Sequence, residues 1–197
     1  CLLSACDSTS GTLVLNQATK VNVTVQGGGS FGDPNNGAHI EVRTLPAGRY
    51  EAELSAKSSD EFLHSLKGGT NLSLKAPGGI PEDSGSFTVP AAQSGQPFDI
   101  AANIVSRSSD SENHRDWETC QYTRNETVCY PGPGGHTSCF TRVVTYTGSR
   151  DVEYFVRTTV KNVDVTLLTA GSNTVLGNFS GSRTDAERHY LYTGFCR

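Results

Sequence analysis

Six cysteines are the residues of this sequence best suited to covalent or metal chemistry. Cys1 and Cys6 lie at the N-terminal end, and the other four lie in the C-terminal half. Cysteines pair as disulfides in oxidising compartments, and they bind zinc where they occur as closely spaced ligand pairs. The four later cysteines lack the Cys-x-x-Cys spacing of a zinc knuckle. Disulfides are therefore the favoured interpretation and a four-cysteine metal site is the alternative, for Cys120, Cys129, Cys139 and Cys196.

A short motif surrounds Cys6. Leu3-Ser4-Ala5-Cys6 consists of an apolar residue, two small residues and a cysteine, and a polar run follows it. This motif resembles the lipobox of bacterial lipoproteins, in which a signal peptidase cuts before the cysteine and the cysteine receives lipid. The resemblance implies that residues 1–5 end a signal peptide, that Cys6 carries the lipid, and that residues 6–11 form a tether. An ordinary secretory signal is the alternative interpretation.

The remaining cysteines form an even set once Cys1 and Cys6 are set aside, as two disulfides in an oxidising compartment require. Four cysteines allow three pairings, and the sequence cannot choose among them. We expect a bond between Cys120 and Cys129 across a short hairpin. We expect a second bond between Cys139 and Cys196, which would hold the C-terminal end in place.

Motifs for catalysis are missing or incomplete. The histidines form no HxH or HExxH pair, and His114-Arg115-Asp116 matches the kinase triplet without the other kinase motifs. Paired carboxylates could meet as in a glycosidase, but solvated loops are the favoured interpretation. We therefore expect no catalytic residue, no metal site and no cofactor. The carboxylate pairs are Glu82 and Asp83, Asp110 and Glu112, Asp116 and Glu118, and Asp185 and Glu187.

Two weaker patterns have ordinary explanations. Residues 33–37 carry the oxygen ligands and glycine of a calcium loop, but they lack its later acidic ligands, so a plain turn is favoured. Four Asn-x-Ser/Thr sequons would accept glycans in a eukaryotic secreted protein. In a bacterial lipoprotein they are products of a composition rich in Asn and Thr. They begin at Asn22, Asn71, Asn125 and Asn178.

Aromatic side chains gather around the cysteines. Packing in a core or beneath a loop is the first interpretation. The second is a surface that binds a sugar or a protein, because Tyr and Trp are enriched at interfaces. We name Trp117, Tyr122, Tyr130 and His136 as the candidates for that surface.

The composition points to an extracytoplasmic β-protein. Charged residues make up 18% of the 197 residues, against about a quarter in an average domain. The net charge of −4 provides no basic patch for nucleic acid. No apolar run reaches the roughly 20 residues of a membrane-spanning helix.

Alternating apolar residues predict an all-β fold of about a dozen short strands, which is an antiparallel β-sandwich with Ig-like or jelly-roll architecture and long loops. At most one short helix is expected, at 60–66. We expect one domain over 12–197, and the polar run 106–118 is the place where a subdivision would fall. The predicted strands lie in a hairpin at 11–26, at 39–43, 49–54, 71–75, 86–89 and 98–105, in a second hairpin at 120–130, and at 142–146, 151–160, 163–168, 173–180 and 188–195.

These observations favour a non-enzymatic cell-envelope lipoprotein that binds or scaffolds another envelope protein or glycan. It would be attached through Cys6 to the inner or outer membrane, on the periplasmic side or at the cell surface. The alternative is an extracellular carbohydrate-acting hydrolase on a jelly-roll fold. A cleft with converging carboxylates would favour the hydrolase, and a flat or loop-built patch would favour the binding module.

Overall fold

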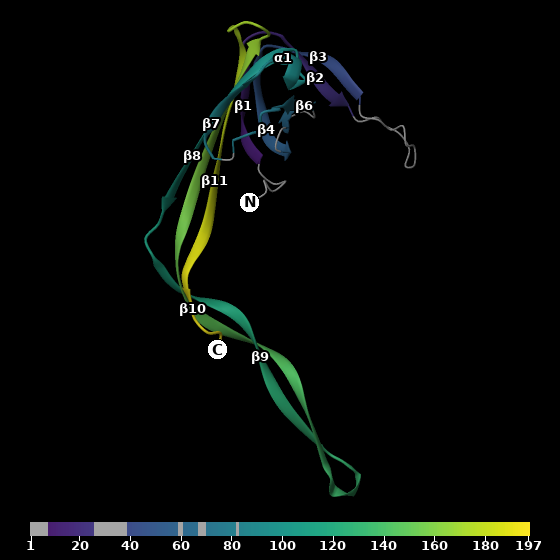
Figure 1. The fold of residues 1–197 in the computed structure, drawn as a ribbon, viewed down its shortest axis with the longest axis vertical. Coiled ribbons are helices and arrows are strands. Elements are labelled where there is room, and N and C mark those ends of the chain that lie inside the picture. The colour runs from purple at the N-terminus through teal and green to yellow at the C-terminus, as the bar shows by residue number, and fades with distance from the viewer. Residues whose placement is uncertain (1–7, 26–38, 59–60, 67–69, 82) are drawn as a thin grey trace. The chain divides into compact units, whose positions relative to one another are not determined.

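The computed structural model describes residues 8–25, 39–58, 61–66, 70–81 and 83–197 (Figure 1). The Cys6 motif and the predicted turn at 33–37 lie outside these residues. The described chain is nearly all antiparallel β-sheet, as the sequence predicts. Its elements are β1 (Ser8–Leu15), β2 (Thr19–Val25), β3 (His39–Leu45), β4 (Gly48–Ser58), β5 (Glu61–Leu66), β6 (Thr70–Lys75), β7 (Gly85–Val89), α1 (Ala91–Ser94), β8 (Phe98–Asp110), β9 (His114–Pro131), the 3-10 turn η1 (Pro133–Gly135), β10 (Thr137–Thr169) and β11 (Val175–Thr193).

The chain separates into two compact units. Unit 1 consists of the described residues up to 107 together with 159–185, and unit 2 consists of residues 108–158 and 186–197. Three strands, β8, β10 and β11, contribute residues to both units. The strand order is β3-β2-β6-β5-β4-β1-β11-β10-β8-β7, and β9 pairs with β10.

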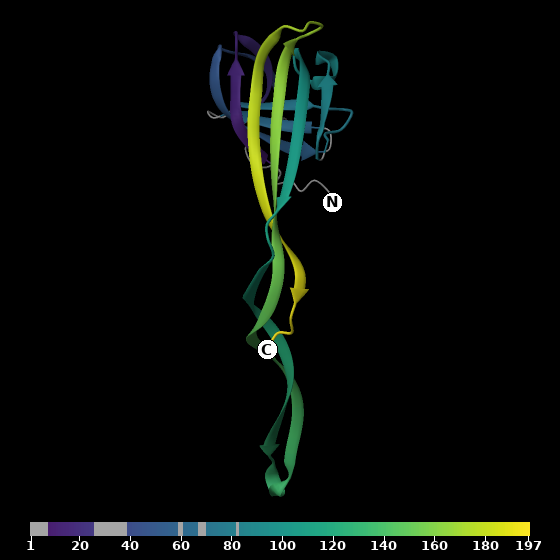
Figure 2. The same cartoon turned by 90° about the vertical axis from the view of Figure 1, so that its left-hand side faces the viewer.

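Unit 1 is a sandwich around one hydrophobic core. In this unit β1, β11, β10 and β8 run side by side, with β4, β5 and β6 behind them (Figure 2). Alternate side chains of the strands point inward, so that period-two patterns become a buried face. The core includes Leu13 and Leu15 of β1, Leu72 and Leu74 of β6, Phe98, Ile100 and Ile104 of β8, Val163, Val165 and Leu167 of β10, and Phe179 of β11.

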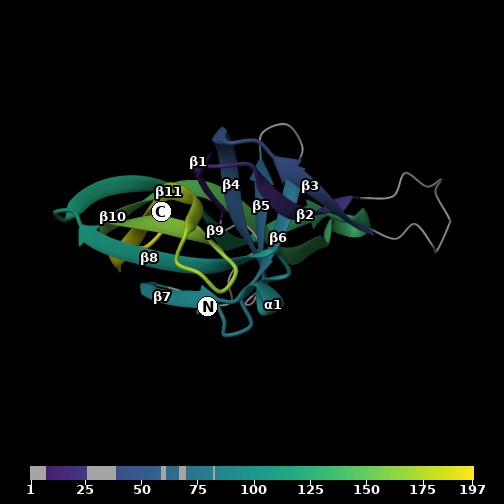
Figure 3. The same ribbon diagram turned by 90° about the horizontal axis from the view of Figure 1, so that it is seen from above.

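The buried Gln96 side chain joins β2 to β6. The two strands share a single paired position, Val23 opposite Leu72. The buried Gln96 side chain donates to the carbonyls of Asn22 and Ser73, each at 2.9 Å, and accepts from the Asn22 amide at 2.8 Å. These bonds bridge the two strands, and they satisfy a buried amide that would otherwise destabilise the fold. Figure 3 shows the strands of this unit from above.

Glycine is required where β1 and β11 pair. Gly11 lies opposite Gly181, and a Cβ on Gly11 would lie 2.3 Å from the Ser180 carbonyl oxygen. Such a distance is far inside van der Waals contact, so any side chain there would force the two strands apart.

Four local predictions are wrong, and strand pairing explains each one. Residues 61–66 form strand β5 and not a helix, because β4 and β6 pair with both of its edges. β1 and β2 are not a hairpin, since β1 pairs with β4 and β11. Residues 120–130 are part of one continuous strand. The separate strands predicted between 142 and 168, and between 173 and 195, are the long strands β10 and β11.

Candidate functional site

Unit 2 is built on a long two-stranded ribbon. β9 pairs with β10 from Thr137 opposite Pro131 to Tyr154 opposite His114, without a shift in register. Successive side chains of a strand point to opposite faces, so even-numbered residues of both strands share one face and odd-numbered residues share the other. The ribbon twists along its length (Figure 1). Most of its side chains are exposed or half-buried.

The structure contains two disulfides, formed by the four cysteines of the C-terminal half, but the predicted pairing is wrong. Cys129 bonds Cys139 and Cys120 bonds Cys196. Cys120 and Cys129 lie on the same strand with side chains on opposite faces, so they cannot reach each other. Cys129 and Cys139 are directly opposite in the ladder, with Cα atoms 4.0 Å apart. Such a short separation identifies a pair without backbone hydrogen bonds between its members, the position where a cross-strand disulfide fits.

Aromatic pairs occupy the even face. Tyr130 stacks on Phe140 near the tip, with ring centroids 5.7 Å apart, and Tyr122 stacks on Tyr146 at 5.6 Å. Tyr130 is 56% exposed and Phe140 is 51% exposed, so the tip pair presents apolar surface to solvent. We call Tyr130, Phe140 and the adjacent Val128 the tip patch.

An ion pair separates the two aromatic stacks. Glu126 and Arg142 are cross-strand neighbours, and the Arg142 guanidinium approaches the Glu126 carboxylate to 3.2 Å. The Tyr146 hydroxyl donates a hydrogen bond to the same carboxylate. These polar contacts join the two strands of the ribbon on its even face.

The base of the ribbon is fastened by a cluster around Glu118. The Glu118 carboxylate accepts hydrogen bonds from Tyr190 at 2.5 Å, Arg188 at 3.2 Å and Arg150 at 3.3 Å. The Tyr190 bond, with help from the two arginines, lowers the pKa of Glu118 below its ordinary value. The same bond raises the pKa of Tyr190.

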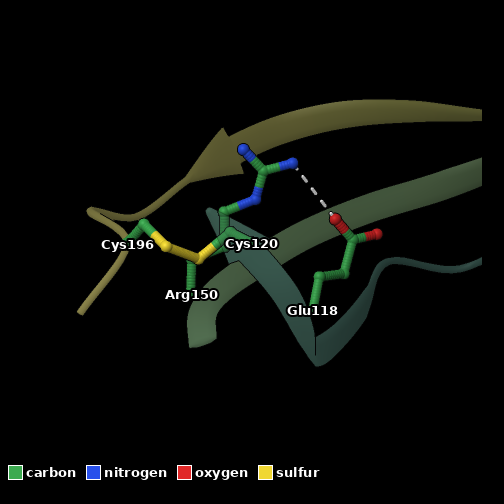
Figure 4. Close-up of a disulfide and its surroundings, with 4 residues drawn as sticks. All are labelled: Glu118, Cys120, Arg150 and Cys196. Carbon is green, nitrogen blue, oxygen red and sulfur yellow. Dashed lines mark hydrogen bonds and ion pairs between the residues drawn. A yellow bond between two sulfur atoms is a disulfide. The ribbon is translucent and has the colours of Figure 1, made fainter. Parts of the chain in front are cut away.

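The Cys120–Cys196 disulfide lies beside this cluster, as Figure 4 shows together with the Arg150–Glu118 ion pair. Arg188 also lies over the Tyr154 ring, with its guanidinium carbon 4.5 Å from the ring centroid. The charged groups of the cluster therefore bind one another, and the cluster attaches β11 to the ribbon.

The four predicted surface residues do not form one patch. Tyr122 and Tyr130 lie on the even face, whereas Trp117 lies on the odd face, opposite Asp151. Trp117 and Tyr130 are 13 residue positions apart along the extended strand, which corresponds to about 40 Å. His136 is exposed and lies directly before β10, next to the tip turn. Phe140, which stacks on Tyr130, is not among these four residues, because alternation alone does not show which residues face each other across a hairpin.

Most carboxylates of the predicted pairs contact a basic side chain or a backbone amide. Asp110 accepts two hydrogen bonds from Arg157 at 2.8 Å, which lower the pKa of its carboxyl group. Asp116 accepts from the Trp117 amide at 2.8 Å, and Asp185 pairs with Arg183. Glu187 lies 3.8 Å from the His189 ring, and Glu82 lies outside the described residues.

Shallow grooves lie on unit 1. One of about 460 Å³ contains Glu51 and Glu53, two residues apart on the same strand. A second, of about 480 Å³, contains one carboxylate, Asp164. A third contains Asp99, which accepts hydrogen bonds from the Ala91 and Gly171 amides.

Within the part of the chain that the structure describes, no group of three or more His, Cys, Asp or Glu side chains could hold a metal ion. Over the same residues, no helix has the length and apolar character needed to cross a membrane. No protein-family model, curated protein or solved structure matches this chain.

Proposed function

We propose that this chain is a cell-envelope lipoprotein, attached through Cys6, that binds another envelope component with the tip patch of its β9–β10 ribbon. The observation that supports this proposal best is the exposed, stacked pair of Tyr130 and Phe140. The ribbon that carries this pair is cross-linked by the Cys129–Cys139 disulfide. Large aromatic side chains held rigidly in exposed positions provide binding energy at a small cost in conformational entropy.

The disulfides support a binding role as well. An isolated two-stranded ribbon is marginally stable in water. The Cys129–Cys139 bond keeps the tip in one register, and the Cys120–Cys196 bond holds its base. A pre-organised surface avoids part of the ordering cost of binding. The partner that this surface suits is a protein or glycan with an apolar face, because the tip patch itself is uncharged.

A hydrolase is less well supported by the grooves. Glycosidases place two carboxylates on either side of the scissile bond, about 5 to 10 Å apart. The Glu51 and Glu53 pair comes from one strand and one face of the sheet, so both groups approach a ligand from the same side.

The proposal is tested by crosslinking in the native membrane. A photoreactive residue is placed at position 130, and a matched one is placed at position 117, where Trp117 is equally exposed but on the other face. We expect one dominant crosslinked partner from position 130 and none from position 117. The double variant Tyr130→Ala/Phe140→Ala should reduce recovery of that partner by about tenfold or more.

The membrane attachment is tested separately with Cys6→Ser, which should release the protein into the soluble fraction. Equal crosslinking from both positions, or unchanged recovery with the double variant, would refute the binding surface. A protein that stays in the membrane after Cys6→Ser would refute the attachment without affecting the ribbon.

A further inference from the structure

The two disulfides of the ribbon differ in exposure. Cys129 and Cys139, which form the tip bond, are both exposed. Cys120 and Cys196, which form the base bond, are both half-buried. Reduction of a disulfide begins when a thiolate reaches one of its sulfur atoms, and exposed disulfides are the labile ones. The tip bond is therefore the more accessible of the two.

Contacts on both sides of the base bond hold its cysteines together whether or not they are bonded. The Gly194 amide donates to the Asp151 carbonyl at 2.7 Å on one side. On the other side, Ser149 and Arg197 exchange two backbone hydrogen bonds of 2.9 and 3.1 Å. The cluster around Glu118 attaches β11 to the ribbon beside the same bond (Figure 4). Two thiols held side by side have a high effective concentration, so the reduced base bond re-forms readily.

The tip bond has weaker support of this kind. Beyond it the chain turns through residues 131–136, which include three glycines, and Gly134 and Gly135 have φ angles of 81° and 84°. Glycine loses more conformational freedom on folding than any other residue, so ordering of this turn is unfavourable. The neighbouring ladder pair, Thr127 and Thr141, is exposed on both strands. Because a two-stranded ribbon is marginally stable in water, the tip strands separate once the tip bond is open.

Opening of the tip bond acts directly on the tip patch. Tyr130 follows Cys129 in β9, and Phe140 follows Cys139 in β10. The two rings are diagonal neighbours across the ladder, and their centroids are 5.7 Å apart. Their stacking therefore requires the register that the tip bond fixes.

We propose that the tip bond is a thiol–disulfide exchange site, at which a dithiol reductant switches the tip patch off while the base bond stays closed. This inference rests on the proposed function for the identity of the surface that is switched. The selective reduction itself depends only on the exposure and the contacts of the two bonds.

The exchange balances atoms and electrons. A thiolate of the dithiol attacks the Sγ atom of one tip cysteine, the S–S bond breaks, and the other tip cysteine leaves as a thiolate that takes up a proton. The second thiol of the dithiol then cleaves the mixed disulfide and releases the first cysteine. The dithiol is oxidised to a disulfide, and the tip pair gains two electrons and two protons.

The order of reduction is measured on the purified chain with Cys1→Ser and Cys6→Ser, so that no other thiol takes part. Dithiothreitol is the probe, and the thiols that it releases are trapped by alkylation and located by peptide mass spectrometry. We expect the tip cysteines to be labelled about tenfold faster than the base cysteines, or more. Equal rates, or faster labelling of the base cysteines, would overturn the inference.

Two matched variants test the reason for this order. Glu118→Gln weakens the cluster beside the base bond, and Glu126→Gln weakens the ion pair with Arg142 nearer the tip bond. We expect Glu118→Gln to accelerate reduction of the base bond alone and Glu126→Gln to accelerate reduction of the tip bond alone. Acceleration of the wrong bond, or of neither bond in both variants, would contradict the local-contact argument on which the inference depends.

The effect on the tip patch is measured with Cys129→Ser/Cys139→Ser, which represents the open state without a reductant that could also act on the partner. Hydrogen exchange in the unit 1 core checks that the variant is folded. We expect crosslinking from position 130 in the native membrane to fall by about tenfold or more. Unchanged crosslinking would overturn the switch and leave the binding surface standing. Selective reduction of the tip bond in a chain that gives no crosslink from position 130 would refute the proposed function and keep the exchange site.

Discussion

In unit 1 most strands send alternate side chains into a shared core, whereas in unit 2 only Val152 and Tyr154 are buried apolar residues among those described. Both units are antiparallel β-structure with alternating sequences. Burial of a Leu, Val or Phe side chain stabilises by about 1.5–3 kcal/mol, so unit 1 is stabilised mainly by its core. Unit 2 lacks a second layer of sheet. Its strands are held together by disulfides, aromatic stacks and charge clusters instead of a core. The comparison shows that an alternating sequence is sufficient to form a strand, but a hydrophobic core forms only where a second layer of strands packs against the first.

The largest expected effect concerns the long disulfide. Cys120→Ser/Cys196→Ser opens a loop with a sequence separation of 76 residues. The chain-entropy relation gives a loss of about 4.5 kcal/mol for such a loop. We expect a lower urea midpoint and loss of amide protection in residues 186–197. An unchanged midpoint would show that the Glu118 cluster alone attaches this segment.

The next effect concerns the core of unit 1. Phe179→Ala removes a ring that is 0% exposed, and we expect a loss of about 3–5 kcal/mol. Tyr130→Ala is the matched control on the ribbon, where the exposed ring should contribute little to folding. Urea unfolding of both variants measures the difference, and equal losses would contradict the contrast between the two units.

A smaller and local effect is expected at the tip. Cys129→Ser/Cys139→Ser opens a loop with a sequence separation of 10 residues, for which chain entropy gives about 2.7 kcal/mol. Hydrogen exchange should speed up between Glu126 and Arg142, while amides of the unit 1 core keep their protection. Faster exchange in the core would show that the two units unfold together.

The smallest effect is a pH dependence at the base of the ribbon. The pKa of Glu118 lies below its ordinary value of 4.5, because the carboxylate accepts from Tyr190, Arg150 and Arg188. A lowered pKa means that the stabilisation is complete above the unfolded pKa and is lost as the pH falls through the folded value. Amide protection near Cys120 should therefore decrease below pH 4.5, and Glu118→Gln should flatten this decrease. An identical profile in the variant would exclude Glu118 as the group that titrates.

The sequence predicts the faces of individual strands better than their partners. The strand predicted at 98–105 has Phe98, Ile100 and Ile104 at even-numbered positions that share one face, and all three are buried in the core. Residues 61–66 contain both strand and helix signals, and pairing with β4 and β6 resolves them as a strand. The hairpin predicted at 120–130 requires a turn at its centre, where only Asn125 among Arg124, Asn125 and Glu126 is a residue type that turns favour. In the structure they pair across the ladder with Val144, Val143 and Arg142.

Residue types and a period of two are sufficient to predict the all-β class and the four cysteines that pair, because both are local properties of the sequence. The pairing of β9 with β10 in one ribbon is visible only in the three-dimensional structure. It placed Cys129 opposite Cys139 and Tyr130 beside Phe140, and it put Trp117 on the other face. The physical reason is that the register between two strands depends on contacts between residues far apart in the chain, which local periodicity does not encode.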